Sequence, residues 1–156
     1  MPVVIHTPRG PNGEEAAADR AESSWKDPHM DRQVVRGPDL PPSIGPYSHA
    51  VRAGGFVFVS GQPGIDPVTG EVPGPTFGAE ARQAFTNLAT VLGAAGSRPD
   101  LVASTTVLVA DIADFAELNT VFAECFPTDP PTRMTMQVPL PRGLRISIGC
   151  VAVEAS

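Results

Sequence analysis

Six polar residues lie near the ends of predicted strands and helices, where side chains of this kind can bind a ligand. The sequence has no Gly-rich phosphate loop, HExxH motif, CxxC motif or nucleophile elbow. Arg133 opens a strand, on the face expected to lie away from the helices. Its planar guanidinium can hold a carboxylate or form a salt bridge between subunits, and spacing alone leaves both open. The six residues are Tyr47, Ser60, Gln62, Asn119, Arg133 and Thr135.

Four positions in or beside this set have specific expectations. Tyr47 can offer its phenol to a ligand or serve as an interface aromatic. His49 is expected on the same strand face as Tyr47, where it could act as a base or simply be hydrogen-bonded. Gly61 lacks a side chain, so its N–H can approach a ligand closely. Asn119 falls within the apolar stripe of a predicted helix, so we expect a buried amide that holds a backbone segment, with ligand contact as the alternative.

Composition excludes several classes of protein. The chain has 156 residues and a formal net charge of -6, which argues against a nucleic-acid partner. No stretch approaches the roughly 20 apolar residues that span a membrane, and no secretory signal is visible, so a cytoplasmic location is expected. Cys125 and Cys150 are too few and too far apart for a disulfide framework or a zinc site, and are expected to be buried reduced thiols.

Two strand-like runs, Tyr47–Arg52 and Phe56–Val59, flank Gly54-Gly55, which predicts a hairpin. Apolar residues at helical spacing then predict a helix that begins near Phe77 and ends at Gly96. Leu101–Ala110 is rich in Thr and Val and is predicted to be a strand. Asp111 is expected to cap a second helix, whose apolar stripe comprises Phe115, Leu118, Val121, Phe122, Cys125 and Phe126.

The last two strands alternate cleanly. In the first, Met134, Met136 and Val138 share one face, opposite Arg133, Thr135 and Gln137. In the second, Leu144, Ile146, Ile148 and Cys150 oppose Arg145, Ser147, Gly149 and Val151. This pattern predicts one face beneath helices and a second, more polar face suited to another subunit's sheet. The fold class is therefore α+β, a mixed sheet of about six strands with two helices on one side.

The chain is expected to divide at residue 43. Residues 1–42 are polar and rich in turn residues, with Trp25 as the only large apolar anchor, and form a mostly irregular N-terminal extension. Residues 43–156 form the domain. The role of the extension cannot be deduced from its sequence.

Four segments carry a resemblance to a known family: IGPYSHAV, VFVSGQPGIDPVTGEV, DIADFAELNTVFAECF and PPTRMTMQVPLPRGLRISIGCVAV. From Ile44 to Val153 the chain resembles the RidA/YjgF family of reactive-intermediate deaminases. The resemblance implies the chorismate-mutase-like YjgF fold, and a homotrimer with a central barrel and three clefts between subunits. It also implies hydrolysis of small enamine or imine acids, such as 2-aminoacrylate, to 2-keto acids and ammonia, with no metal or cofactor.

The resemblance also assigns roles. Arg133 would hold the substrate carboxylate with help from the Gly61 backbone. Tyr47 and Asn119 would line or shape the cleft, and Ser60 and Gln62 belong to the same turn as Gly61. Thr135 stands where many members have a cysteine.

The chain departs from the family in its last strand. Where deaminating members have I-E-I-E-A, it has Ile146-Ser147-Ile148-Gly149-Cys150. The second glutamate, which positions or activates water in the family, corresponds to Gly149. General acid–base help contributes about 10²–10⁴-fold, so its loss could reduce deamination strongly. The glycine is also expected to open space beside the arginine for a bulkier ligand.

Three functions remain open from the sequence. The first is an imine or enamine deaminase acting on a small carboxylate-bearing intermediate. The second is a specialised biosynthetic enzyme acting on a larger imine or carbonyl intermediate, favoured by Gly149 and the extension. The third is a non-catalytic module that binds a small acid. Ribonuclease activity is opposed by the negative charge.

Overall fold

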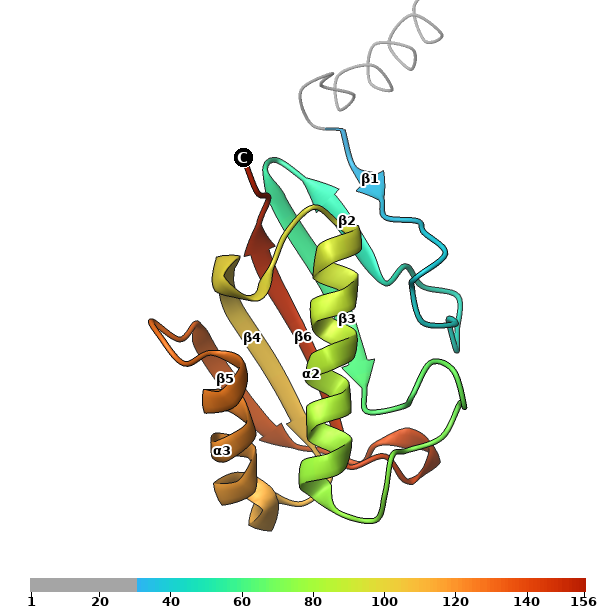
Figure 1. The fold of residues 1–156 in the computed structure, drawn as a ribbon, viewed down its shortest axis with the longest axis vertical. Coiled ribbons are helices and arrows are strands. Elements are labelled where there is room, and N and C mark those ends of the chain that lie inside the picture. Colours follow the sequence, from blue (N-terminus) through green and yellow to red (C-terminus); the bar gives the residue numbers. More distant parts are fainter. Residues whose placement is uncertain (1–30) are drawn as a thin grey trace, which may run out of the picture. The chain divides into compact units, whose positions relative to one another are not determined.

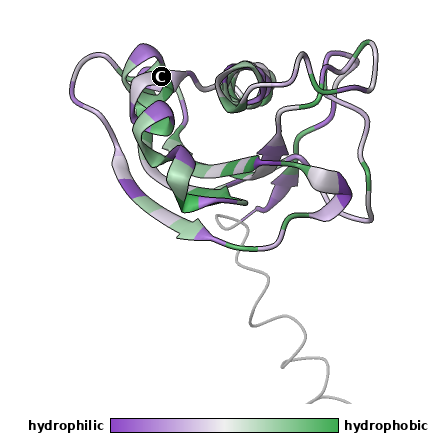
Figure 2. Ribbon diagram, turned by 90° about the horizontal axis from the view of Figure 1, so that it is seen from below, coloured by the Kyte–Doolittle hydropathy of each residue, from purple (hydrophilic) through white to green (hydrophobic). Residues whose placement is uncertain are grey.

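Both α-helices of the described residues lie on one face of a mixed six-stranded sheet (Figure 1, Figure 2). The computed structural model describes residues 31–156, so Trp25 and most of the predicted extension lie outside the described residues. The strand order is β1-β2-β3-β6-β4-β5, with β4 and β5 parallel and the other pairs antiparallel. The elements are β1 (Gln33–Val34), β2 (Ala50–Ala53), β3 (Phe56–Pro63), α2 (Phe77–Ala94), β4 (Val102–Val109), α3 (Phe115–Cys125), β5 (Thr132–Gln137) and β6 (Ile146–Val153). The predicted fold class is confirmed.

The hairpin forms where the glycine pair predicted it. Gly54 and Gly55 have φ angles of 59° and 81°, a conformation that costs glycine little. The ladder pairs Ala53 with Phe56 and ends at Ala50 and Val59. Tyr47–His49 lie outside β2, in a bend that precedes it, because regular pairing stops where β3 bulges at Ser60 and Gly61.

Both predicted helices are present. Thr76 caps α2 by accepting from Ala79 N, and Gly96, with φ 74°, follows its C-terminus as expected. Asp111 caps a 3₁₀ turn, Ile112–Asp114, that leads directly into α3. The carboxylate accepts from Ala113 N at 2.9 Å.

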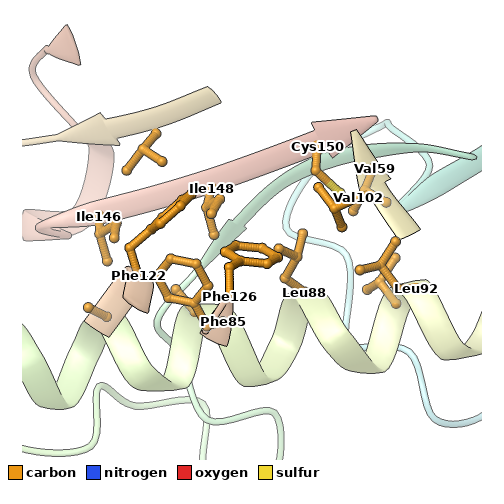
Figure 3. Close-up of a cluster of buried hydrophobic side chains, with 14 of the residues drawn as sticks. Val59, Phe85, Leu88, Leu92, Val102, Phe122, Phe126, Ile146, Ile148 and Cys150 are labelled. Atoms are coloured by element: carbon orange, nitrogen blue, oxygen red, sulfur yellow. The ribbon is translucent and has the colours of Figure 1, made fainter. Parts of the chain in front are cut away.

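The core lies between the helices and the sheet. Phe85, Phe122 and Phe126 form one aromatic cluster, with ring centroids 4.8–6.1 Å apart (Figure 3). Ile146 and Ile148 of β6 face this layer and are fully buried, as their alternation predicted. Edge-to-face aromatic contacts add to the hydrophobic burial that holds α3 against α2.

A buried carboxylate fixes the beginning of β6. Glu80, in the first turn of α2, is 1% exposed, and its Oε1 accepts from Arg145 N at 2.7 Å. A buried carboxylate needs such donors to offset the cost of its desolvation. The bond ties the last strand, which carries Ser147 and Gly149, to the helix layer.

The opposite face of the sheet has no helix over it and carries exposed apolar side chains. They are Phe56, Phe58, Met134, Met136 and Val153, between 41% and 60% exposed. We call this surface the open face. The methionines were expected beneath the helices, and that expectation is wrong for β5. The helix α3 covers the opposite face of this edge strand, where Arg133 and Thr135 are half-buried.

The N-terminal part of the described chain contributes to the sheet. β1 pairs with β2 through Gln33 opposite Arg52, and Val35 is buried in the core. Among residues 31–156, no helix has the length and apolar character required to cross a membrane.

Both cysteines are free thiols, as predicted, with Cys150 buried and Cys125 half-buried. Burial raises the pKa of Cys125 to about 11 and that of Cys150 to about 12. Since only the thiolate reacts, we expect alkylation of Cys125 at pH 8 to be about 100-fold slower than that of a peptide thiol. Timed iodoacetamide labelling, with the urea-unfolded protein as control, checks this. Equal rates for the folded and unfolded protein would contradict the raised pKa of the thiols.

Candidate functional site

Three of the predicted site residues gather beside α3. Arg133 and Thr135 lie on the same face of β5, and Asn119 reaches them from α3. Arg133 Nη2 donates a hydrogen bond to Asn119 Oδ1 at 2.8 Å. We call this cluster the arginine half-site. It opens onto a shallow groove of about 390 Å³, lined by Asn119, Phe122, Ala123, Phe126, Pro130, Pro131 and Arg133.

Aromatic rings hold the guanidinium in place. Arg133 Cζ lies 4.7 Å from the ring centroid of Phe122 and 5.3 Å from that of Phe115. Cation–π attraction of this kind orients an arginine without using the donors at the edge of its fork. Neither phenylalanine was selected from the sequence. Their spacing of two helical turns on the face that also bears Asn119 was the available signal.

The charge of Arg133 is not neutralised within the described part of the chain. The ion pairs there are Arg82–Glu124 and Arg98–Asp100, both on the surface. Arg133 was expected on the helix-free face, and this expectation is wrong because the rings of α3 and Asn119 provide better contacts on the helix side. On this face too, the guanidinium forms no ion pair with a described residue and can bind a carboxylate.

Asn119 also differs from expectation. Its side chain is exposed in the chain, and it bonds a side chain rather than a backbone segment. The stripe that contains it is only partly covered, because α3 lies at the edge of the sheet and Phe115 is 39% exposed. Thr135 Oγ1 is buried, and no described residue bonds it.

The remaining predicted residues gather around the bulge of β3. Ser60 Oγ donates to Ser48 O at 2.7 Å, and Ser60 N donates to His49 O at 2.9 Å. These bonds hold the segment that carries Tyr47 against β3. Gln62 is 1% exposed, and its Nε2 donates to Ser60 O at 2.9 Å. We call Tyr47, Ser60, Gly61, Gln62 and Gly149 the tyrosine half-site.

The neighbours of Gly61 and Gly149 explain why both positions lack side chains. A Cβ on Gly61 would lie 2.5 Å from Ser147 Oγ, so Ser147 occupies the space directly beside it. A Cβ on Gly149 would lie 3.0 Å from Val59 O and 3.5 Å from Gly61 N. In this chain, therefore, Gly149 opens no space beside Arg133. It packs against the backbone of the bulge, and Ser147, which sequence reasoning did not select, is the β6 side chain nearest Gly61.

The two half-sites do not meet within one chain. β6 and β4 separate β3 from β5 by three interstrand steps of about 4.8 Å, or about 14 Å, and Gly149, on β6, lies two steps from β5. The half-sites also differ in face, because Arg133 points towards α3 while Ser147 and Gly149 alternate with the buried Ile146 and Ile148. A single chain therefore presents two separate clusters of candidate site residues.

The expectation that His49 is simply hydrogen-bonded does not hold among the described residues. It is 9% exposed, and neither ring nitrogen has a partner among the described residues. Its ring meets that of Tyr47 edge-on, with centroids 5.9 Å apart. The two therefore lie side by side, although both fall outside the regular strand.

Comparison with known proteins places this arrangement in a family. The family model for endoribonuclease L-PSP matches residues 38–154. A mouse protein named 2-iminobutanoate/2-iminopropanoate deaminase is 42% identical over 125 residues, which cover 79% of this chain and 92% of the mouse protein.

Solved structures agree. RidA from an Antarctic Psychrobacter is 36% identical with a TM-score of 0.74, covering 78% of this chain and 98% of that one. E. coli TdcF with bound serine is 33% identical with a TM-score of 0.74, covering 79% and 99%. The chain belongs to the endoribonuclease L-PSP family, which confirms the resemblance to RidA/YjgF proteins that its sequence segments carry.

Proposed function

We propose that this protein hydrolyses small imine or enamine carboxylic acids, of the type 2-iminopropanoate and 2-iminobutanoate, to 2-keto acids and ammonia. Mouse and human relatives, 42% and 40% identical, are named for deaminating these two compounds. The chain covers 92% and 90% of their lengths, so the shared region is nearly the whole of each relative.

The observation that carries the proposal is the arginine half-site. Arg133 is oriented by two rings and one amide, and the ion pairs of residues 31–156 do not include it. A guanidinium in this state binds a planar carboxylate through two parallel hydrogen bonds. The substrate acids share that carboxylate, and we assign its binding to Arg133, with Asn119 and Thr135 shaping the space beside it.

We further propose that the site is completed by a second copy of the chain. The half-sites lie on different parts of the surface, so contact between copies is head-to-tail, and such contacts form a ring when the rotation between copies closes. A ring of three would cover the open face, whose exposed phenylalanines and methionines are a surface that monomeric proteins rarely leave free. In this homotrimer Tyr47, Ser60, Gly61, Gln62 and Gly149 of one copy face Arg133 of the next.

The test measures keto acid and ammonia released from freshly generated 2-iminopropanoate. Imines hydrolyse spontaneously, so the rate in buffer is subtracted. We expect turnover above this rate with no added metal or cofactor, and a mass by light scattering of three chains. A purified, folded protein that leaves the buffer rate unchanged would end the proposal.

The other functions considered are not favoured. Relatives that match most of the chain are named as deaminases of small imines, which gives no support to a larger biosynthetic substrate or to a non-catalytic module. The family description mentions an endoribonuclease, but a net charge of -6 opposes binding to a phosphate backbone. The cytoplasmic location stays a prediction from the sequence.

A further inference from the structure

A cavity of about 140 Å³ lies beside Tyr47 and Gln62 of the tyrosine half-site. Its walls include Tyr47, His49, Gln62, Ile65, Asn87 and Arg142. Prolines and isoleucines form most of the remaining lining. The cavity exceeds the roughly 30 Å³ that one molecule occupies in liquid water, so water and ammonia both fit.

The polar groups of the cavity divide into two kinds. Asn87 is saturated by protein, because its Nδ2 donates to Pro63 O and Ile65 O at 2.8 Å and its Oδ1 accepts from Gln83. His49 and Gln62 are not. Both His49 nitrogens and Gln62 Oε1 are buried without a partner among residues 31–156. Buried polar atoms of this kind cost free energy unless a small polar molecule bonds them, so the cavity is built to hold one.

The arrangement matches the needs of a water molecule that attacks carbon. A neutral imidazole has one ring nitrogen that accepts a hydrogen bond, and Gln62 Oε1 is a second acceptor. Water that donates to both has its oxygen lone pair free for reaction. Among the residues that the structure describes, the other titratable or charged groups lining the cavity are Tyr47 and Arg142, and none of its lining residues has a carboxylate.

We propose that His49 and Gln62 bind the hydrolytic water and that His49 is its general base. This inference rests on the proposed function and assigns a role that Ser147 and Gly149 cannot fill. Neither residue has a carboxylate, whereas the resemblance to RidA/YjgF proteins implies a glutamate at both positions. Tyr47 and Gln62 belong to the tyrosine half-site and also line the cavity, so the cavity adjoins the half-site.

The proton balance is complete without another reactant. Water oxygen forms a bond to the carbon of the protonated imine, one water proton passes to His49, and the C=N π electrons move to nitrogen. The resulting carbinolamine takes the proton back from His49 on its nitrogen. The C–N bond then breaks, the nitrogen leaves as ammonia with the bonding pair, and the hydroxyl proton passes to ammonia. The products are the 2-keto acid and ammonium.

His49→Gln tests the inference because glutamine keeps hydrogen-bonding groups but cannot take a proton. We expect kcat for 2-iminopropanoate to fall by about 100-fold or more, with little change in KM. Imidazole added to His49→Ala should restore part of kcat in a saturable way, and should not help His49→Gln. Ser97→Ala is the matched control, since Ser97 is a buried polar residue that bonds Val153 O away from the cavity. Its kcat should be unchanged.

The outcomes separate this inference from the proposed function. If the wild-type protein is inactive, the proposed function fails. If it is active and His49→Gln has wild-type kcat, only the role of His49 fails. A loss confined to KM, or a folded His49→Ala that imidazole does not rescue, also overturns the base. Melting temperatures and trimer mass of each variant show whether it is folded, and His49→Gln decides alone should His49→Ala not fold.

Discussion

Arg133→Ala is expected to lower kcat/KM for 2-iminopropanoate by about 100-fold or more, because the substrate carboxylate loses a charged partner that can form two hydrogen bonds with it. The guanidinium is already oriented by Phe122, Phe115 and Asn119, so wild type loses little entropy when a carboxylate binds. The variant has no other cation in the groove, whose lining includes Arg133 as its single charged residue among those described. The measurement is steady-state release of keto acid over a range of substrate concentrations.

Two further variants make this result specific. Arg133→Lys keeps the charge but loses the fork and the ring contacts, so its kcat/KM should fall between wild type and alanine. Arg98→Ala is the matched control, because Arg98 is an exposed arginine that pairs with Asp100 at 2.8 Å and does not line the groove. It should retain full activity. Equal kcat/KM for Arg133→Ala and Arg98→Ala would show that Arg133 does not bind the substrate.

Mixing two inactive variants is expected to restore activity if each site draws on two chains. Gly61→Val should be inactive, because its branched side chain would cover the Gly61 N–H and displace the Ser147 hydroxyl, whose Oγ lies 2.5 Å from a Cβ at this position. Arg133→Ala lacks the other half-site. In a ring assembled at random from equal amounts of both, roughly one site in four combines an intact Arg133 with an intact Gly61. Activity should therefore return to about a quarter of the wild-type value.

The mixing experiment has a simple control. The variants are combined folded, and again after unfolding and refolding together. Only the second mixture exchanges chains, so only it should gain activity. A mixture that stays inactive after proven exchange would mean that the half-sites are joined within one chain, against the separation of β3 from β5 in the sheet.

The packing around Gly149 opposes a side chain at this position. Its Cα packs against the β3 bulge, so a glutamate there requires the bulge to move by a few tenths of an ångström. The packing around position 149 therefore fits glycine better than a residue with a side chain. Ser147, directly beside Gly61, is the β6 side chain that borders the site.

Local patterns in the sequence determined much of the fold. Gly54-Gly55 can adopt positive φ with little cost, so the hairpin follows from two residues. The apolar spacing from Phe77 and the glycine at position 96 set both ends of α2. β6 is a central strand with helices over one face, so its alternation also fixed which side chains are buried. The candidate site residues, above all Arg133, were selected from the sequence by their residue types and their positions near strand ends.

Only the tertiary structure decided where those residues meet. Alternation has a period of two and separates the faces of a strand, but it does not say which face a helix covers. In the edge strand β5 that choice depends on Phe115 and Phe122, which contact Arg133 from α3. The tertiary structure also decided the environment of His49. It places His49 in one cavity with Gln62 and Asn87 and leaves both ring nitrogens without a partner among the described residues. Contacts between segments far apart in the chain set these energies, so no local pattern encodes them.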